Sequence, residues 1–398
     1  MRIEPVRLKI YILRGRFWPA RGLSSLKIGI TCYPTYGGSG VVATELGKEL
    51  ANRGHEIHFV SYALPIRLDK FNERIYFHEV DMMPYPLFQY PPYDLALAAK
   101  MYEISNYAGL DLLHVHYALP HAISAYLAKS MLEERDIKII TTLHGTDITL
   151  VGMDRSYFPI TKFGIRKSDG VTTVSKYLQT LTQTQVGRQD IEVIPNFVDT
   201  TLFKKPEDSK CARHTLAPGG EPILMHASNF RPVKRIINVI EVFERVLKKT
   251  DARLVFVGDG PERSIAERYC HDNKIAEKVL FLGRQDNLPD LMGCADVLLL
   301  PSELESFGLV ALEAMSCEVP VVATIVGGLP EVVVHGETGF LANLGDVDTM
   351  AEYSLEILKN ANLRQKLGQL GRKRALEVFD QRKIVPLYEQ YYEKILSQ

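Results

Sequence analysis

From residue 27 onward, short apolar runs alternate with stretches of helical periodicity. Residues 27–32, 111–116 and 138–143 are apolar runs of strand length, and residues 41–53 repeat their apolar positions at helical spacing before Gly54. Strands of a parallel sheet are covered on both faces, so they read as continuous apolar runs. The alternation therefore predicts an α/β fold with doubly wound parallel sheets.

A polar stretch with proline and glycine, residues 199–221, separates two such series. A chain of 398 residues is too long for one ordinary core, so two domains of roughly 150–200 residues are expected. We predict an N-terminal domain over 27–198, a connection over 199–221 and a C-terminal domain over 222–375. Residues 376–398 are predicted to form a helix that could pack back on the N-terminal domain. A cleft between two such domains is the default ligand site.

Composition and charge exclude several classes of protein. The net charge is −1, so no general attraction to nucleic acid or to a membrane surface is expected. No apolar run reaches the roughly 18 residues of a membrane span. The five cysteines are odd in number and form no C-x-x-C pair. This usage predicts a reducing, cytoplasmic location without a structural disulfide or a zinc site.

Residues 1–26 differ from the rest of the chain. They hold six Lys and Arg residues against one acid, Glu4. They lack the apolar region and small-residue cleavage site of a signal peptide. We predict a basic extension that is not part of the folded core.

Two carboxylates, Glu305 and Glu313, stand eight positions apart after an apolar run. If a helix begins near Gly308, helical spacing separates them by about 12 Å, and the free N–H groups of residues 307–310 form an anion site at its start. Because carboxylates accept hydrogen bonds from hydroxyls, this arrangement suits a nucleoside diphosphate sugar. The alternative is that Glu305 caps the helix and Glu313 is a solvated surface residue.

Two further segments have the composition of phosphate sites. Residues 37–40, Gly-Gly-Ser-Gly, lie between a predicted strand and a predicted helix, where glycine lets the backbone approach a phosphate. A plain tight turn is the alternative. Arg231, Lys234 and Arg235 follow the first strand of the second domain and could contact a diphosphate. A solvated basic helix start is the alternative, although cations at a helix N-terminus call for a counter-anion.

A histidine at the end of another predicted strand is a further candidate. His144 stands in Thr-Leu-His-Gly-Thr-Asp at 142–147, where it could hydrogen-bond a sugar hydroxyl or act as a base. A structural histidine is the alternative. His114, His116 and His121 precede it without partner ligands at metal spacing, so no metal site is predicted.

As a set, these motifs resemble those of the retaining GT-B glycosyltransferases of family 4. The acid pair with Ser-Phe-Gly-Leu, Val-Gly-Asp-Gly-Pro at 257–261 and Gly-Gly-Leu-Pro-Glu at 327–331 carry the resemblance, which covers nearly all of 27–398. The residues at 37–47 and 88–94 look like the branch that joins N-acetylglucosamine from UDP-N-acetylglucosamine to L-malate in bacillithiol biosynthesis. The resemblance implies two Rossmann-like domains facing across a cleft, the first binding the acceptor and the second the nucleotide sugar.

The same resemblance implies a role for each candidate residue. The catalytic set is His144, Glu305, Arg231 and Lys234, with no residue assigned as nucleophile. The donor is bound by Gly37, Gly38, Asn229, Arg284, Ser306, Phe307, Gly308, Leu309, Val310 and Glu313. The acceptor is bound by Ser39, Tyr117, Thr141 and Thr142. No metal and no cofactor are expected, because Arg231 and Lys234 supply positive charge.

Two positions depart from the family pattern. Asn229 stands where many members carry arginine, and Arg231 follows two residues later, so which cation meets which phosphate stays open. Glu318 stands where glycine is usual, and a left-handed turn there would be strained.

The resemblance thus implies a cytoplasmic retaining N-acetylglucosaminyltransferase that acts on L-malate. The alternatives are a family member with another small or lipid-linked acceptor, and a nucleotide-sugar sensor without activity. Small-molecule substrates are expected, and nucleic acid or a membrane span is not. The oligomeric state is left open, with a homodimer as one candidate.

Overall fold

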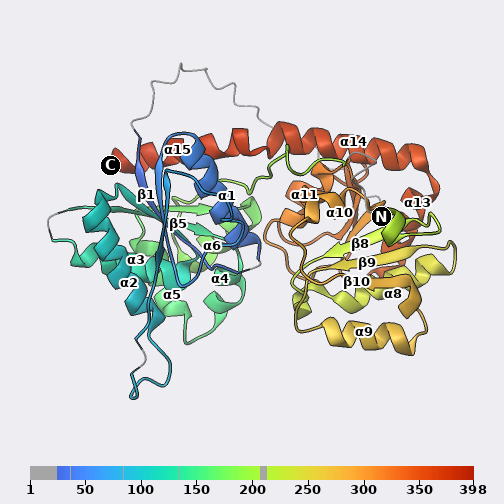
Figure 1. Cartoon of the computed structure of the whole chain (residues 1–398), viewed down its shortest axis with the longest axis horizontal. Helices are drawn as coiled ribbons and strands as arrows, with labels where there is room; N and C mark the ends of the chain where they lie inside the picture. The colour runs from blue at the N-terminus through green and yellow to red at the C-terminus, as the bar shows by residue number, and fades with distance from the viewer. Residues whose placement is uncertain (1–24, 36, 84, 134, 207–212) are drawn as a thin grey trace.

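The computed structural model describes residues 25–35, 37–83, 85–133, 135–206 and 213–398. Within these ranges the chain forms two α/β domains that lie side by side (Figure 1). All strand pairs in both sheets are parallel, and helices cover the sheets on both faces. The prediction of two doubly wound parallel sheets is therefore confirmed.

The N-terminal domain is built on a seven-stranded sheet in the order β3-β2-β1-β4-β5-β6-β7. Its strands are β1 Lys27–Thr31, β2 Glu56–Ser61, β3 Ile75–Glu79, β4 Leu112–His116, β5 Lys138–Leu143, β6 Gly170–Thr173 and β7 Glu192–Val193. Its helices are α1 Gly38–Asn52, α2 Tyr93–Ile104, α3 Ile123–Met131, α4 Thr146–Thr149, α5 Phe158–Lys167 and α6 Lys176–Val186.

The C-terminal domain has a six-stranded sheet in the order β10-β9-β8-β11-β12-β13. Its strands are β8 Ile223–Ala227, β9 Arg253–Val257, β10 Val279–Phe281, β11 Val297–Leu300, β12 Val321–Thr324 and β13 Gly339–Ala342. The helices from this part of the chain are α7 Arg213–Leu216, α8 Ile236–Leu247, α9 Arg263–Asp272, α10 Leu288–Met292, α11 Leu309–Ser316, α12 Leu329–Val332, α13 Val347–Lys359, α14 Ala361–Val378 and α15 Gln381–Leu396.

Residues of the central strands contribute to two different hydrophobic cores, one on each face of the sheet. In β1, Ile28 and Ile30 pack with apolar residues of α1 and α15. In β4, Leu113 and Val115 pack with apolar residues of α2 and α3 on the other face. Successive side chains of a strand point to opposite faces, so a strand apolar at every position is buried on both.

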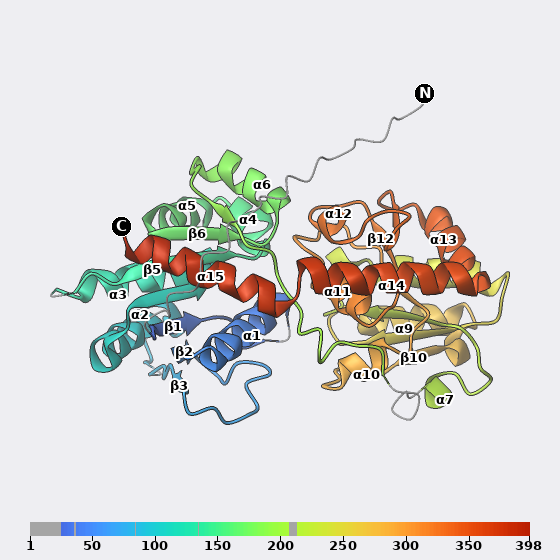
Figure 2. The ribbon, with the colours of Figure 1, turned by 90° about the horizontal axis from the view of Figure 1, so that it is seen from above.

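The last two helices cross from one domain to the other. α14 lies along the C-terminal domain and α15 along the N-terminal domain (Figure 1, Figure 2). The hydroxyl of Tyr391 accepts a hydrogen bond from the amide of Val171 at 2.9 Å, and that of Tyr392 lies 2.7 Å from Nδ1 of His114. The helix predicted over 376–398 therefore begins at Gln381, and residues 376–378 belong to α14.

The cysteines correct one expectation. Cys32, Cys270 and Cys317 are free and buried, whereas Cys294 is disulfide-bonded. The prediction of no structural disulfide is wrong, because an odd count and the lack of C-x-x-C say nothing about cysteines far apart in sequence. None of the described helices is both long and apolar enough to cross a membrane.

Glu318, just after α11, takes the left-handed conformation with φ 62°. A Cβ atom on Gly368 of α14 would lie 2.2 Å from the carbonyl oxygen of Glu318, so the turn is packed tightly against that helix. Glu318 thus has a backbone conformation that favours glycine.

We expect Glu318→Gly to raise the free energy of unfolding by about 0.5–1 kcal/mol. The strain relieved is roughly 1–2 kcal/mol, and the added chain entropy of glycine offsets about 0.5–1 kcal/mol of it. Denaturant unfolding measures the change. Glu318→Ala is the control, because it keeps the strain, and an equal gain in that variant would assign the effect to loss of the carboxylate.

Candidate active site

Each sheet reverses its strand order once, between β1 and β4 in the first domain and between β8 and β11 in the second. Ligands of doubly wound folds bind outside the carboxyl ends of the strands at such points. The loops after β1, β4 and β5 carry the N-terminal candidates, and the loops after β8 and β11 carry most of the C-terminal ones. The candidate residues therefore face each other from two domains.

Two helix N-termini meet at this point. α1 follows Gly37 and α11 follows Gly308, and neither helix has a side-chain cap or an acidic residue in its first turn. A Cβ atom on Gly38 would lie 3.8 Å from Cδ2 of Leu309. Each helix start carries free N–H groups and positive potential, so the two together form an anion site.

The two domains are in close contact beside the anion site. Gly145 has φ 122°, and a Cβ atom there would lie 1.6 Å from Oγ of Ser306. On the other side of this loop, the amide of Gly328 donates to the carbonyl oxygen of Glu305 at 2.8 Å. A Cβ atom on Gly327 would lie 1.9 Å from that same oxygen. Glycine thus permits the close packing that fixes residues 305 and 306.

Glu305 and Lys234 form a close ion pair. Nζ of Lys234 donates to Oε2 of Glu305 at 2.5 Å, and the side chains are 19% and 17% exposed. The structure brings together a cation that can take a phosphate and a carboxylate that can take a sugar hydroxyl. Arg235, the third cation of this segment, pairs instead with Glu303 at 3.1 Å.

The remaining predicted donor residues differ in position. Arg231 is exposed. Burial raises the pKa of Tyr117, and the charge of Arg231 opposes this rise, so Arg231 acts across the cleft. Oδ1 of Asn229 is buried and has no hydrogen-bond partner among the described residues. The side chain of Phe307 is in the core against Phe379, at 5.7 Å between ring centres, so only its backbone can face a ligand. Arg284 is exposed after β10, the edge strand.

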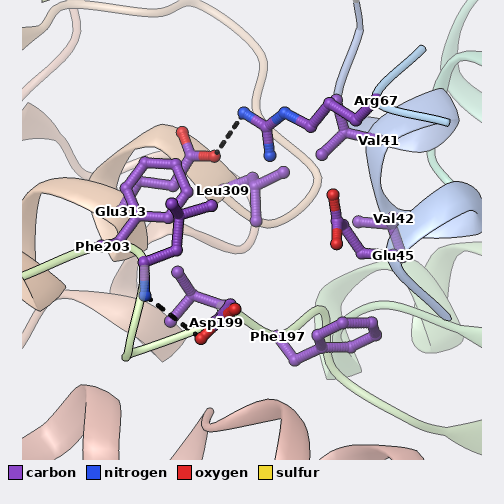
Figure 3. A pocket seen from close by; sticks show the side chains of 11 residues that line it. Val41, Val42, Glu45, Arg67, Phe197, Asp199, Phe203, Leu309 and Glu313 are labelled. Atoms are coloured by element: carbon purple, nitrogen blue, oxygen red, sulfur yellow. Dashed lines mark hydrogen bonds and ion pairs between the residues drawn. The ribbon is translucent and has the colours of Figure 1, made fainter. Parts of the chain in front are cut away.

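Glu313 is buried in α11 and faces the N-terminal domain (Figure 3). Burial raises its pKa to about 7, although Arg67 lowers it. Nη2 of Arg67 lies 3.6 Å from Oε1 of Glu313, and the guanidinium lies over the ring of Phe203 at 5.6 Å. Glu45 of α1 disfavours ionisation of Glu313, and Asp199 is a further acidic residue in this lining.

The space beside Glu313 is small. A cavity of about 20 Å³ lies between α1, α11 and the segment around Phe203, with Arg67 and Glu45 in its wall. That volume holds a water molecule and not a sugar ring. A ligand that reaches Glu313 from this side must displace Arg67 or separate the domains.

The predicted acceptor residues fall into two groups. Burial raises the pKa of Tyr117 and the neighbouring Ser39 opposes this rise, while the hydroxyl of Tyr117 accepts a hydrogen bond from Oγ1 of Thr146 at 3.1 Å. The ring of Tyr117 lies 5.5 Å from that of His144. Ser39, Tyr117 and His144 therefore form one group at the edge of the cleft.

Thr141 and Thr142 do not join this group. Both are fully buried inside β5, with Oγ1 of Thr141 2.7 Å from Oγ of Ser168 and Oγ1 of Thr142 2.7 Å from Nε2 of His114. Their placement in the acceptor site is corrected, because β5 continues to Leu143 and keeps both hydroxyls inside the sheet.

Several site residues were not predicted from the sequence. Glu331 accepts from the amides of Lys176 and Tyr177 at 3.0 and 2.9 Å, so it caps α6 of the other domain. Asp147 accepts from the amide of Gly145 at 2.9 Å, and burial raises its pKa to about 6. Both stand inside recognised motifs, whereas Arg67 lies in a loop without any pattern that could have indicated its role.

No group of three or more His, Cys, Asp or Glu residues within the described ranges could hold a metal ion. The absence of a metal or cofactor requirement stays a prediction from the sequence.

Comparisons with known proteins identify the family. A model described as Glycosyltransferase Family 4 matches residues 36–202, and one described as Glycosyl transferases group 1 matches residues 209–374. The N-acetyl-alpha-D-glucosaminyl L-malate synthase of Bacillus anthracis is 50% identical over 372 residues, which are 93% of this chain and 97% of that protein. The chain is a family 4 glycosyltransferase.

A more distant relative of the glycosyltransferase is named for a different donor and acceptor. The GDP-mannose-dependent monoacylated alpha-(1-6)-phosphatidylinositol monomannoside mannosyltransferase of Corynebacterium glutamicum is 29% identical over 289 residues, 69% of this chain and 74% of that protein.

Solved structures agree on the fold of the glycosyltransferase. Anabaena Alr3699/HepE in complex with UDP and glucose superposes with a TM-score of 0.80 at 21% identity, covering 94% of this chain and 100% of that one. Sucrose-phosphate synthase from Thermosynechococcus elongatus gives 0.78 at 23% identity, with 94% and 99% covered. The predicted GT-B architecture is confirmed.

We expect Gly145→Ala to lower the turnover of the glycosyltransferase by about 10²-fold, because the new Cβ atom displaces Ser306 and shifts the catalytic loops. Gly54→Ala is the matched control. Gly54 also has a positive φ, 104°, but nothing lies within 4 Å of its added Cβ atom. Both variants should lose stability by roughly 1–2 kcal/mol, and only Gly145→Ala should lose turnover. Equal turnover in the two variants would show that the loops need not touch.

Proposed function

We propose that this glycosyltransferase moves N-acetylglucosamine from UDP-N-acetylglucosamine to the hydroxyl of L-malate with retention of anomeric configuration, the first step of bacillithiol biosynthesis. The observation that carries the proposal is the meeting of two uncapped helix N-termini beside Lys234 and Glu305. The Bacillus anthracis relative, 50% identical and named as an N-acetyl-alpha-D-glucosaminyl L-malate synthase, supports the sugar and the acceptor. The HepE complex with UDP supports a uridine nucleotide.

The donor lies across the meeting point of the two helices. Its diphosphate is held by the amides of Gly38, Leu309 and Val310, with Lys234 and Arg231 as cations. Its ribose hydroxyls reach Glu313, and the uracil lies toward Arg284. The hydroxyls of N-acetylglucosamine are held by Glu305 and His144.

The reaction needs positioning and charge stabilisation more than a reactive side chain. The bond from the sugar anomeric carbon to the diphosphate oxygen breaks, and a bond to the malate oxygen forms on the same face. The departing phosphate oxygen takes the malate proton, so the products are UDP and N-acetylglucosaminyl malate. The helix N-termini and Lys234 stabilise the charge on the leaving group. Glu305 is paired with Lys234 at 2.5 Å, which makes it a poor nucleophile.

Malate brings two carboxylates that need cations or N–H groups. Arg231 is the cation whose charge acts on Tyr117, the centre of the group formed with Ser39. We assign one malate carboxylate to this side of the cleft. A cytoplasmic location and a homodimer stay predictions from the sequence.

We expect UDP release when the protein is mixed with UDP-N-acetylglucosamine and L-malate, with the glycosyl malate detected by mass spectrometry. Succinate is the matched control acceptor, because it has the same two carboxylates and no hydroxyl. Folded protein that binds UDP but releases none above the succinate control would contradict the malate acceptor.

The Corynebacterium relative, which is named for a phosphatidylinositol monomannoside acceptor, supports a second acceptor class. A panel that adds phosphatidylinositol to malate and succinate separates the two classes. Turnover with the lipid alone would replace malate by a lipid-linked acceptor. UDP binding without turnover on any acceptor would favour a nucleotide-sugar sensor.

The pKa of Glu313 leads to a pH prediction. Burial raises this pKa to about 7, so the carboxylate is charged above pH 7 and accepts ribose hydroxyls better there. The Kd for UDP-N-acetylglucosamine should fall by up to about tenfold between pH 6 and pH 8, as measured by calorimetry. Glu313→Gln should bind more weakly and without this pH dependence, while malate binding changes little. The same pH dependence in wild type and Glu313→Gln would exclude Glu313 as its source.

A further inference from the structure

His144, a member of the group formed with Ser39 and Tyr117, shares a hydrogen bond with a second histidine, His116. His116 ends β4, and His144 follows β5, the neighbouring strand. Nδ1 of His116 lies 2.8 Å from Nε2 of His144, and the rings stack with their centres 5.1 Å apart. The pairing of β4 with β5, in which His116 is opposite Thr142, brings the two rings together.

Both rings are neutral. Burial lowers the pKa of His144 to about 3 and holds that of His116 well below its usual value. The neighbouring rings of His114 and His121 lower the pKa of His116 further. The nearby Asp147 carboxyl is bonded to the amides of Gly145 and Ala118 rather than to either ring. Each neutral imidazole carries one N–H and one lone pair, so one of the two facing nitrogens donates to the other.

The environment of the far nitrogen of His116 decides which one donates. Nε2 of His116 is buried and has no hydrogen-bond partner among the described residues. A proton there would be a buried N–H without an acceptor, which is rarer and costlier than an unpaired lone pair. The proton of His116 therefore belongs on Nδ1, which donates to Nε2 of His144.

His121 shows the same pattern one turn away. Its Nδ1 donates to the carbonyl oxygen of His116, and its buried Nε2 is unpaired within the described residues. Because a carbonyl oxygen only accepts, the proton of this neutral ring is on Nδ1. An unpaired Nε2 lone pair is thus tolerated twice in this small region.

We propose that His116 is a positioning residue that fixes His144 with its proton on Nδ1, so that His144 donates a hydrogen bond to the transferred sugar. This inference rests on the proposed function and assigns one of the two roles that the sequence left open. The lone pair of His144 Nε2 is occupied by His116, so the ring has none with which to accept the malate proton. That proton goes to the departing phosphate oxygen, as the same-face reaction requires.

Three variants of His116 test the proposal. His116→Asn offers an N–H group near the position of Nδ1, His116→Asp offers only acceptors in the same shape, and His116→Leu offers neither. We expect His116→Asn to keep kcat within about tenfold of wild type and the other two to lose about 10²-fold. The Kd for UDP should be the same in all four proteins, because His116 does not contact the nucleotide. A purely structural role would lower kcat equally in the Asn and Asp variants.

Spectroscopy and pH add readouts of the proton itself. Nitrogen-15 NMR of the His144 ring should show the proton on Nδ1 in wild type and in His116→Asn, and on Nε2 in His116→Asp. The carboxylate introduced by His116→Asp should also raise the pKa of His144. The kcat of His116→Asp should then change between pH 5 and pH 8. In the wild type, titration of His144 should cause no such change in kcat.

The outcomes separate this inference from the proposed function. A wild-type spectrum with the proton on Nε2 of His144 would overturn the assignment, and it is recorded without substrate. Equal kcat values for folded His116→Asn and His116→Asp would overturn the positioning role. Lack of malate-dependent UDP release by wild type would instead count against the proposed function. If His116→Asp fails to fold, the wild-type spectrum and the Asn and Leu variants still decide the question.

Discussion

The site depends on the way α15 ties the end of the chain to its first domain. Glu389 of α15 accepts hydrogen bonds from Nη2 of Arg53 at 2.7 Å and from Nε2 of His55 at 3.0 Å. Burial alone would raise the pKa of Glu389, but the bonds from His55 and Arg53 bring that pKa below its usual value. The Glu389 carboxylate that pairs with Arg53 is therefore charged. α14 packs on α11 of the other domain, where Gly371 contacts Met315. The two helices together therefore set how the two sheets face each other.

That orientation places two helix N-termini against each other, which is electrostatically unfavourable without an anion. Two cations of the cleft already have partners, Lys234 with Glu305 and Arg67 with Glu313. A nucleotide sugar would exchange these partners, since its phosphates take the cation and its hydroxyls take the carboxylates. Lys234 and Arg67 thus have counter-ions before a ligand binds, whereas the two helix starts offer their amides to an anion.

The sequence could single out features whose residues lie close together along the chain. The acid pair, the glycine loop and the cations after β8 were found because each stands between a strand and a helix, where local pattern is informative. Thr141 and Thr142 were misplaced even though the predicted strand over 138–143 matches β5, because the sequence does not show that Ser168 and His114 take up their hydroxyls. The disulfide of Cys294 was missed because no local spacing indicates it.

Local sequence patterns indicated the two doubly wound sheets and the kinds of side chain at the strand ends. Apolar periodicity and glycine positions are local, so a single chain displays them. The tertiary structure alone decided that Arg67 meets Glu313, that Glu331 caps α6 and that His116 meets His144. These contacts join segments that are far apart in sequence or on different domains. They follow from strand register and domain orientation, which no local pattern records.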